Sequence, residues 1–225
     1  MPQALSAPRD GGYCKRADGK INGGCKLAAL KTKTTAPERT PVVILFAETR
    51  GFTRTSAVLD PTVVFARVGE FFALAATVVE RNGGILRDML NDTLMATFAN
   101  GDAQRAVRAA EELQREFMAL EEAWHGEYGI RAAVAMGLHA GEVVIGSTDG
   151  PLAGRMLIVG DSVSVANRLL HRARAGEFVL SNSVISALVT AGIALEIEEL
   201  PPLVMPRREP IPIFGVLRDT RLDFT

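Results

Sequence analysis

Residues 42–53 read Val-Val-Ile-Leu-Phe-Ala-Glu-Thr-Arg-Gly-Phe-Thr, and this stretch decides the fold. Its first six residues are apolar and rich in β-branched side chains, which is typical of a strand buried on both faces. An acid, Glu48, stands at the end of that strand, and a glycine turn at Gly51 follows it. Backbone N–H groups in such a turn can hold a phosphate, and a strand-end carboxylate can hold a cation. The stretch therefore predicts a buried strand whose end carries polar chemistry.

Strands and helices alternate along the chain after this stretch. A helix is expected to begin at Pro61, behind the capping residue Asp60, and to end at Asn82. Further helices are expected to begin after Asp102, at 160–162 and at 181–183, and further strands at 85–89, 93–98, 130–139, 141–147, 156–159, 178–180, near 195–199 and at 211–217. The order lacks the strict strand–helix rhythm of a barrel, so it predicts an α+β domain with a mixed sheet.

Composition indicates a globular protein with a charged leader. The chain has 225 residues, of which 48% are hydrophobic and 23% charged, as in soluble domains. The net charge of −1 gives no pull toward nucleic acid or an anionic membrane. Residues 1–40 carry eight Lys/Arg against three Asp/Glu, so we expect a flexible basic leader over 1–40 and a domain over 41–225. We also expect a cytoplasmic setting, because the N-terminus lacks a signal-peptide core and no apolar run approaches the ~20 residues that cross a bilayer.

Two further segments hold residues that can carry chemistry. Asp92 lies in the turn of the predicted hairpin 85–98, where a carboxylate also has a purely local use as a turn former. Glu48 and Asp92, at neighbouring strand ends, could share a divalent ion, because Mg²⁺ takes a few carboxylates together with substrate phosphates. Ser164 and Arg168 are four residues apart on one face of a predicted helix. There the arginine could bind a phosphate bidentately, or it could be a solvated surface residue.

Four segments in this order resemble the catalytic domain of the class III nucleotidyl cyclases, the adenylate and guanylate cyclases. They are FAETRGFT at 46–53, GGILRDMLNDTLMATF at 83–98, GLHAGEVVIG at 137–146 and RMLIVGDSVSVANRL at 155–169. The resemblance extends from about residue 41 to residue 180. It implies a ferredoxin-like α+β fold, with a mixed, mostly antiparallel sheet flanked by helices, and a head-to-tail homodimer with active sites at its interface.

The resemblance also implies a reaction and a set of residues. The ribose 3′-hydroxyl of a nucleoside triphosphate attacks the α-phosphate and expels pyrophosphate, with Mg²⁺ or Mn²⁺ as cofactor. One subunit supplies the metal carboxylates and the base contacts, and the other supplies an Asn and an Arg that steady the nucleotide. The implied metal ligands are Glu48 and Asp92, the implied catalytic residues are Ser164 and Arg168, and the implied nucleotide-binding residues are Gly51, Phe52, Thr53, Asp88 and Arg155.

The chain departs from the family pattern at four of these positions. Glu48 stands where the family has a metal-binding Asp, and Ser164 stands where it has the Asn. A longer carboxylate disturbs the octahedral geometry of Mg²⁺, and a hydroxyl lacks the paired N–H donors of an amide. Asp88 and Arg155 occupy positions where adenylate cyclases have a Lys and an Asp, so both signs are inverted.

The inverted pair leaves two interpretations open. In one, Asp88 and Arg155 pair and fill the base pocket, and the protein is a degenerate cyclase-homology domain for dimerisation or nucleotide sensing. In the other, they bind a base: Asp88 accepts from guanine N1–H and N2–H, and Arg155 reaches O6 and N7. Cytosine is also compatible with a carboxylate, whereas adenine N1 finds no donor on Asp88. The sequence thus predicts a cyclase of weak activity that favours guanine over adenine, with the degenerate module as the alternative.

Overall fold

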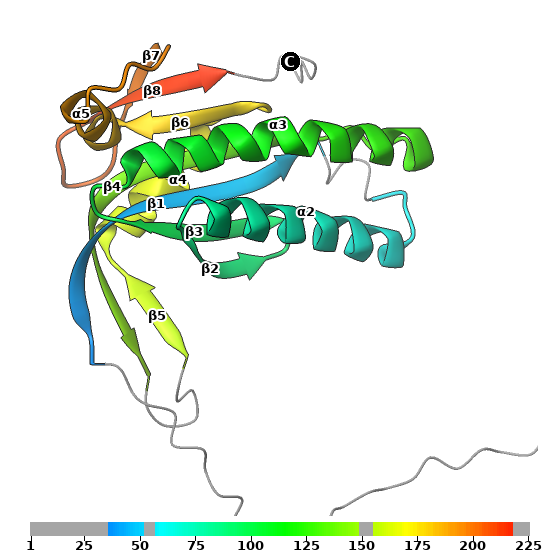
Figure 1. The fold of residues 1–225 in the computed structure, drawn as a ribbon, viewed down its shortest axis with the longest axis horizontal. Coiled ribbons are helices and arrows are strands. Elements are labelled where there is room, and N and C mark those ends of the chain that lie inside the picture. The colour runs from blue at the N-terminus through cyan, green and yellow to red at the C-terminus, as the bar shows by residue number, and fades with distance from the viewer. Residues whose placement is uncertain (1–35, 52–56, 149–154, 218–225) are drawn as a thin grey trace, which may run out of the picture.

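An eight-stranded mixed sheet forms the centre of the protein in the computed structural model, which describes residues 36–51, 57–148 and 155–217 (Figure 1). The strands are β1 (Glu38–Arg50), β2 (Ile85–Leu90), β3 (Thr93–Ala99), β4 (Ala133–Ser147), β5 (Met156–Val159), β6 (Glu177–Ser181), β7 (Glu198–Leu203) and β8 (Ile211–Leu217). Their order is β2-β3-β1-β4-β6-β8-β7, and β5 pairs with β4. Among these strands, only β4 and β6 run parallel.

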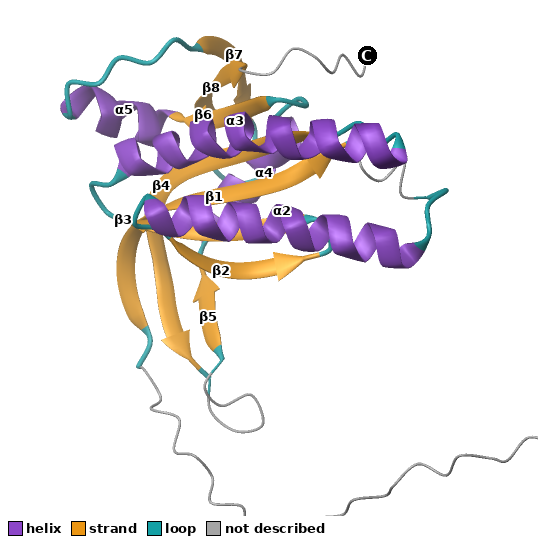
Figure 2. Ribbon diagram, turned by 45° about the vertical axis from the view of Figure 1, so that its right-hand side comes forward, coloured by secondary structure: helices purple, strands orange, loops and turns teal. Residues whose placement is uncertain are grey.

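Helices cover both faces of this sheet, as predicted for an α+β fold. The helices are α2 (Pro61–Arg81), α3 (Ala103–Tyr128), α4 (Asp161–Arg172) and α5 (Asn182–Thr190). Figure 2 shows α2 and α3 side by side across the strands, while α4 lies on the opposite face. The alternating residues of β1 explain the two layers: Val43 and Leu45 belong to the core under α2 and α3, and Val42 and Ile44 belong to the core on the α4 side.

The strand that opens the domain is longer than the sequence predicted. β1 begins at Glu38, inside the predicted leader, because it pairs with β4 over its whole length, from Glu38 opposite Ile145 to Arg50 opposite Ala133. The same ladder makes β4 one continuous strand, so the predicted break between 130–139 and 141–147 is wrong. Residues 1–35 of the leader lie outside the described residues.

Helix α2 begins and ends as its sequence signals predict. The Asp60 carboxylate accepts a hydrogen bond from the Thr62 backbone N–H, and Pro61 is the first helical residue. By length and composition α2 is apolar enough to cross a membrane, which the expectation of no such apolar run had missed. In this fold, however, α2 packs on α3, and its buried side chains, including Phe71 and Val78, belong to the core.

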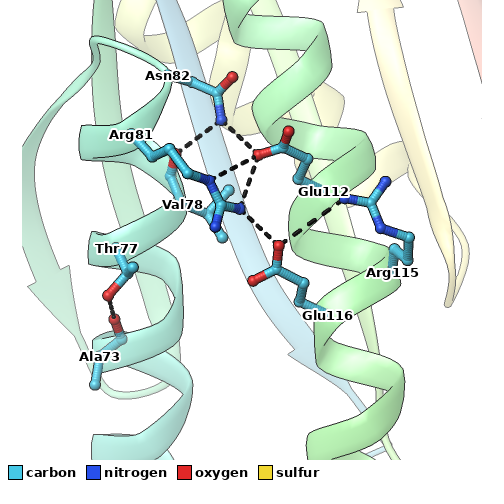
Figure 3. Close-up of polar contacts among 8 residues, drawn as sticks. All are labelled: Ala73, Thr77, Val78, Arg81, Asn82, Glu112, Arg115 and Glu116. Atoms are coloured by element: carbon cyan, nitrogen blue, oxygen red, sulfur yellow. Dashed lines mark hydrogen bonds and ion pairs between the residues drawn. The ribbon is translucent and has the colours of Figure 1, made fainter.

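A polar network joins the end of α2 to α3 (Figure 3). The Asn82 side-chain amide donates to the Val78 carbonyl at 3.0 Å and to the Glu112 carboxylate at 2.8 Å. Arg81 donates to Glu112 and also to Glu116, at 2.6 Å. These contacts, with the Asn82 amide first among their causes, lower the pKa of Glu112. The network fixes how α2 and α3 lie relative to each other above the hairpin β2–β3.

Helix α4 approaches the sheet most closely at Gly137 of β4. A Cβ atom at this position would stand 2.2 Å from the Leu170 backbone nitrogen and 2.5 Å from the Ala166 carbonyl oxygen, both in α4. These are backbone atoms of a packed helix, so they cannot give way as the end of a flexible side chain does. The missing side chain of Gly137 therefore sets the distance between α4 and the sheet.

Replacing Gly137 with alanine is expected to destabilise the protein by roughly 1–3 kcal/mol or more, because the methyl group forces α4 away from β4. The measurement is the free energy of unfolding from urea titration. The matched control is Gly69→Ala on α2, where a Cβ would meet nothing within 4 Å. That change is expected to be neutral or stabilising by up to ~1 kcal/mol, since alanine favours a helix. Equal stability of the Gly137→Ala protein and the wild type would contradict the packing argument.

Candidate active site

The carboxylate of Glu48 lies near the end of β1, where the sequence placed it. Its Oε1 accepts from Arg50 Nη1 at 2.5 Å, and its Oε2 accepts from the Thr93 hydroxyl at 3.3 Å. Glu48 and Thr93 are direct partners in the β1–β3 ladder, so they share one face of the strand pair. The side chain of Glu48 is 18% exposed and thus still open to solvent.

Asp92 lies in the turn between β2 and β3, as predicted. Asn91 before it adopts a left-handed conformation with φ 55°, which asparagine tolerates better than most residues other than glycine. Asp92 Oδ2 accepts from the Thr49 hydroxyl at 2.9 Å. Since Thr49 follows Glu48 and Thr93 follows Asp92, each carboxylate is bonded to the neighbour of the other. Both carboxylates therefore lie at one end of the β1–β3 strand pair.

This strand end has the right chemistry for a hard divalent cation. Carboxylates are the protein ligands that Mg²⁺ prefers, and it completes its shell with water and substrate phosphates. No group of three or more candidate ligands of the His, Cys, Asp or Glu type gathers anywhere in the described part of the chain. Within that part of the chain, the carboxylates available at this strand end are those of Glu48 and Asp92. That they bind one ion together stays a prediction.

A cavity of about 490 Å³ opens beside this strand end, between the β2–β3 hairpin and α4. Apolar side chains from β1, the hairpin, β5 and α4 line most of it. Its polar lining residues are Asp88, Asn91, Thr93, Ser164, Asn167 and His171. The volume and the mixed lining of this cavity are typical of sites that bind a small organic ligand through a few polar contacts.

The structure brings together some of the predicted nucleotide-binding and catalytic residues in this cavity. Asp88 and Ser164 both line it within a single chain, although the resemblance implied that they serve a site from different subunits. Arg168 and Arg155 are exposed and do not line it. Arg155 directly precedes β5, where its carbonyl accepts from the Thr148 N–H, so its pairing with Asp88 stays a prediction.

The loop after β1 is only partly described. Gly51 has φ 85°, the left-handed conformation that favours glycine and that a turn after Arg50 requires. The other two predicted nucleotide-binding residues of this loop, Phe52 and Thr53, lie outside the described residues.

Comparison with known proteins identifies the domain. The model of the adenylate and guanylate cyclase catalytic domain matches residues 34–205, which is most of the chain. The chain belongs to this family. It is 29% identical over 132 residues to an adenylate cyclase of Anabaena cylindrica, a match that covers 57% of this chain and 26% of that protein. The chain therefore spans about a quarter of this curated relative.

Solved structures support the same fold. The adenylyl cyclase CyaB from P. aeruginosa superposes with a TM-score of 0.74 at 20% identity, covering 82% of this chain and 97% of that one. The guanylyl cyclase Cya2 superposes with a TM-score of 0.70 at 24% identity, covering 82% and 96%. Adenylyl and guanylyl cyclases thus share the architecture of this chain, and the fold alone does not distinguish their substrates.

Arg50 is a feature of this cyclase domain that the sequence analysis missed. Besides its contact with Glu48, its Nη2 donates to the Leu170 carbonyl of α4 at 3.0 Å. One guanidinium therefore joins the strand-end carboxylate to the C-terminal part of α4. The spacing of Glu48 and Arg50, two residues apart in a strand, places both on one face and could have indicated the pair.

His139 of the cyclase domain lies in a buried hydrogen-bonded cluster and not in the cavity. Its Nδ1 lies 2.9 Å from the Ser181 hydroxyl and 3.3 Å from that of Ser183. Burial, with a smaller contribution from the positive charge of Arg208, lowers the pKa of His139 to about 4. The imidazole is therefore neutral in the folded protein at neutral pH, and its role is structural.

Because the pKa of His139 is lowered, the free energy of unfolding is expected to fall in mild acid. Its pKa is about 4 when folded against about 6.5 when unfolded, so between these values only the unfolded chain is protonated. Stability therefore falls as pH drops from ~6.5 to ~4, by up to ~1.4 kcal/mol per pH unit. In urea titrations across this range, the His139→Gln protein should lack this part of the loss. His125→Gln, on the exposed face of α3, is the control and should keep the wild-type profile; a wild-type profile in His139→Gln would refute the assignment.

Proposed function

We propose that this domain converts a nucleoside triphosphate into a 3′,5′-cyclic nucleotide and pyrophosphate, in cytoplasmic signalling. The observation that carries the proposal is the cavity lined by Asp88 and Ser164, which opens beside the strand end with Glu48 and Asp92. A related solved structure is the guanylate cyclase domain of RhGC from Catenaria anguillulae, which was determined in complex with GTP. It is 17% identical to this chain and superposes with a TM-score of 0.68. It supports a nucleoside triphosphate as the ligand.

In the proposed reaction, the 3′-oxygen forms a bond to the α-phosphorus, and the bond from that phosphorus to the bridging oxygen of pyrophosphate breaks. Glu48 and Asp92 would hold Mg²⁺ or Mn²⁺, which lowers the pKa of the attacking hydroxyl and neutralises the leaving group. Arg168 would bind the α-phosphate as its charge grows, and Ser164 would position the sugar. The 3′-proton leaves to solvent or to the phosphate.

The enzyme is proposed to be a homodimer that pairs head to tail. The hairpin and β5, which contribute to the lining of the cavity, expose six large apolar side chains: Ile85, Met89, Leu90, Met156, Leu157 and Val159. Exposed large apolar side chains beside a cavity favour an interaction site. A second copy on this surface would close the cavity and bring Arg168, exposed on α4, to a site shared between subunits.

Weak activity follows from two substitutions in the proposed site. The additional methylene of Glu48 displaces its carboxylate relative to an aspartate, and Ser164 offers no amide. Loss of one donor aimed at the transition state costs roughly 10²–10³ in rate. The ion pair with Arg50 adds a competitor for Glu48. The ion pair between Arg50 and Glu48 also favours the alternative function. In that alternative, the protein is a cyclase-homology domain that dimerises or senses nucleotides without turnover.

The test is an assay of the purified chain with ATP, GTP, CTP and UTP, each with Mg²⁺ and with Mn²⁺, followed by chromatography of the cyclic products. Product is expected from GTP above ATP. Asp92→Asn should abolish it, because the variant removes one of the two metal-binding charges, whereas Asp102→Asn, at the start of α3 and outside the site, should retain it. If every nucleotide stays intact although the protein is dimeric, the enzyme interpretation fails and the degenerate module takes its place.

Asp88 is expected to determine the base. The Asp88→Lys protein should lose at least tenfold in kcat/KM with GTP, because a lysine cannot accept from guanine N1–H and N2–H, and it should gain on ATP. The measurement compares kcat/KM for the two nucleotides. Glu199→Lys, an exposed acid on β7, controls for the change in charge. Unaltered GTP turnover in Asp88→Lys would show that the base is bound elsewhere.

A further inference from the structure

One face of α4 presents three polar side chains to the cavity. Ser164, Asn167 and His171 follow one another at spacings of three and four residues, which places them in a single stripe along the helix. The hairpin residue Asp88 belongs to the same lining. Any ligand in the cavity therefore meets this polar stripe on α4.

Asn167 is the residue of this stripe with the greatest unused hydrogen-bonding capacity. Its side chain is partly buried, and across residues 36–51, 57–148 and 155–217 no hydrogen bond to its amide is found. A carboxamide carries two N–H donors and an oxygen acceptor, and those of Asn167 are open to the cavity and are not sealed from solvent. Asparagine is also a poorer helix former than alanine. Helix propensity therefore does not favour an amide at this position, and a ligand in the cavity can use its donors.

The position of Asn167 relates it to Ser164. The two residues are three apart in α4, so their Cα atoms are separated by about 4.5 Å along the helix axis and lie within the same stripe. A serine hydroxyl has less reach than an amide and only one donor. The amide that is missing at position 164 is thus present one helical turn further along, in the same cavity.

We propose that Asn167 contacts the sugar and base of the bound nucleoside triphosphate and supplies the amide that Ser164 lacks. This inference rests on the proposed function for the identity of the ligand. Asn167 donates its N–H groups to acceptors of the nucleoside from the α4 side, while Asp88 accepts from the base on the hairpin side. The nucleoside is held between two walls of one chain.

The experiment measures binding of guanosine 5′-(α,β-methylene)triphosphate, which cannot be cyclised, to the purified 225-residue chain with Mg²⁺ by titration calorimetry. Asn167→Ala should weaken binding about tenfold, the loss expected for one or two hydrogen bonds. Asn182→Ala, which removes an exposed asparagine at the start of α5, should bind within twofold of the wild type. The double variant Ser164→Asn/Asn167→Ala returns the amide to position 164 and should recover most of the lost affinity. A purely structural role of Asn167 would give no such rescue.

The outcomes separate this inference from the proposed function. Wild-type affinity in Asn167→Ala, loss without rescue in the double variant, or no binding of the analogue by the wild type would each overturn the role of Asn167. Absence of cyclic product from the wild type, with tight analogue binding that depends on Asn167, would overturn only the catalytic proposal. Where the wild type turns over GTP, kcat/KM should fall in Asn167→Ala and recover in the double variant in parallel with binding.

Discussion

The close approach of α4 to β4 at Gly137 is the constraint on which the site depends. Because no Cβ intervenes, the backbone of α4 rests directly on the sheet, next to the small residue Ala135. Ser164 and Asn167 lie on this helix, whereas Asp88 lies on the hairpin, so the width of the cavity depends on the depth at which α4 packs. Any larger residue at position 137 would move one wall of the cavity relative to the other.

The sequence predicted the elements whose signals are local. The apolar run 42–47 is a buried strand, Asp60 and Pro61 begin a helix, and the turn at Asn91 joins two strands of a hairpin. In each case the deciding interaction lies within a few residues of the signal. The positions of Glu48 and Asp92 followed from the end of the strand at 42–47 and from the hairpin turn at Asn91, and β1 and β3 are neighbours in the sheet. Their role as metal ligands stays a prediction.

Features that depend on residues far apart in the chain could not be predicted from local sequence signals. The stretch 133–147 contains glycines that suggest a turn, yet pairing with the thirteen residues of β1 keeps it one strand. The bond from Arg50 to the Leu170 carbonyl joins residues 120 positions apart, so no pattern near Arg50 indicates it. The cavity also depends on distant partners, because its lining comes from β1, β2, β3, β5 and α4. Asn167 lines a cavity only because the hairpin faces α4.

The charge arrangement at the strand end connects folding to the proposed chemistry. Two carboxylates that end the same strand pair repel each other, and here Arg50 offsets the charge of Glu48 while the Thr49 hydroxyl bonds Asp92. Under the proposed function, a divalent ion at Glu48 would compete with a guanidinium that also donates to the Leu170 carbonyl of α4, and its affinity would be lower than at a site of unpaired carboxylates. Under the proposed function, this competition would account for a low rate of cyclisation, because the Glu48 carboxylate is already paired with Arg50.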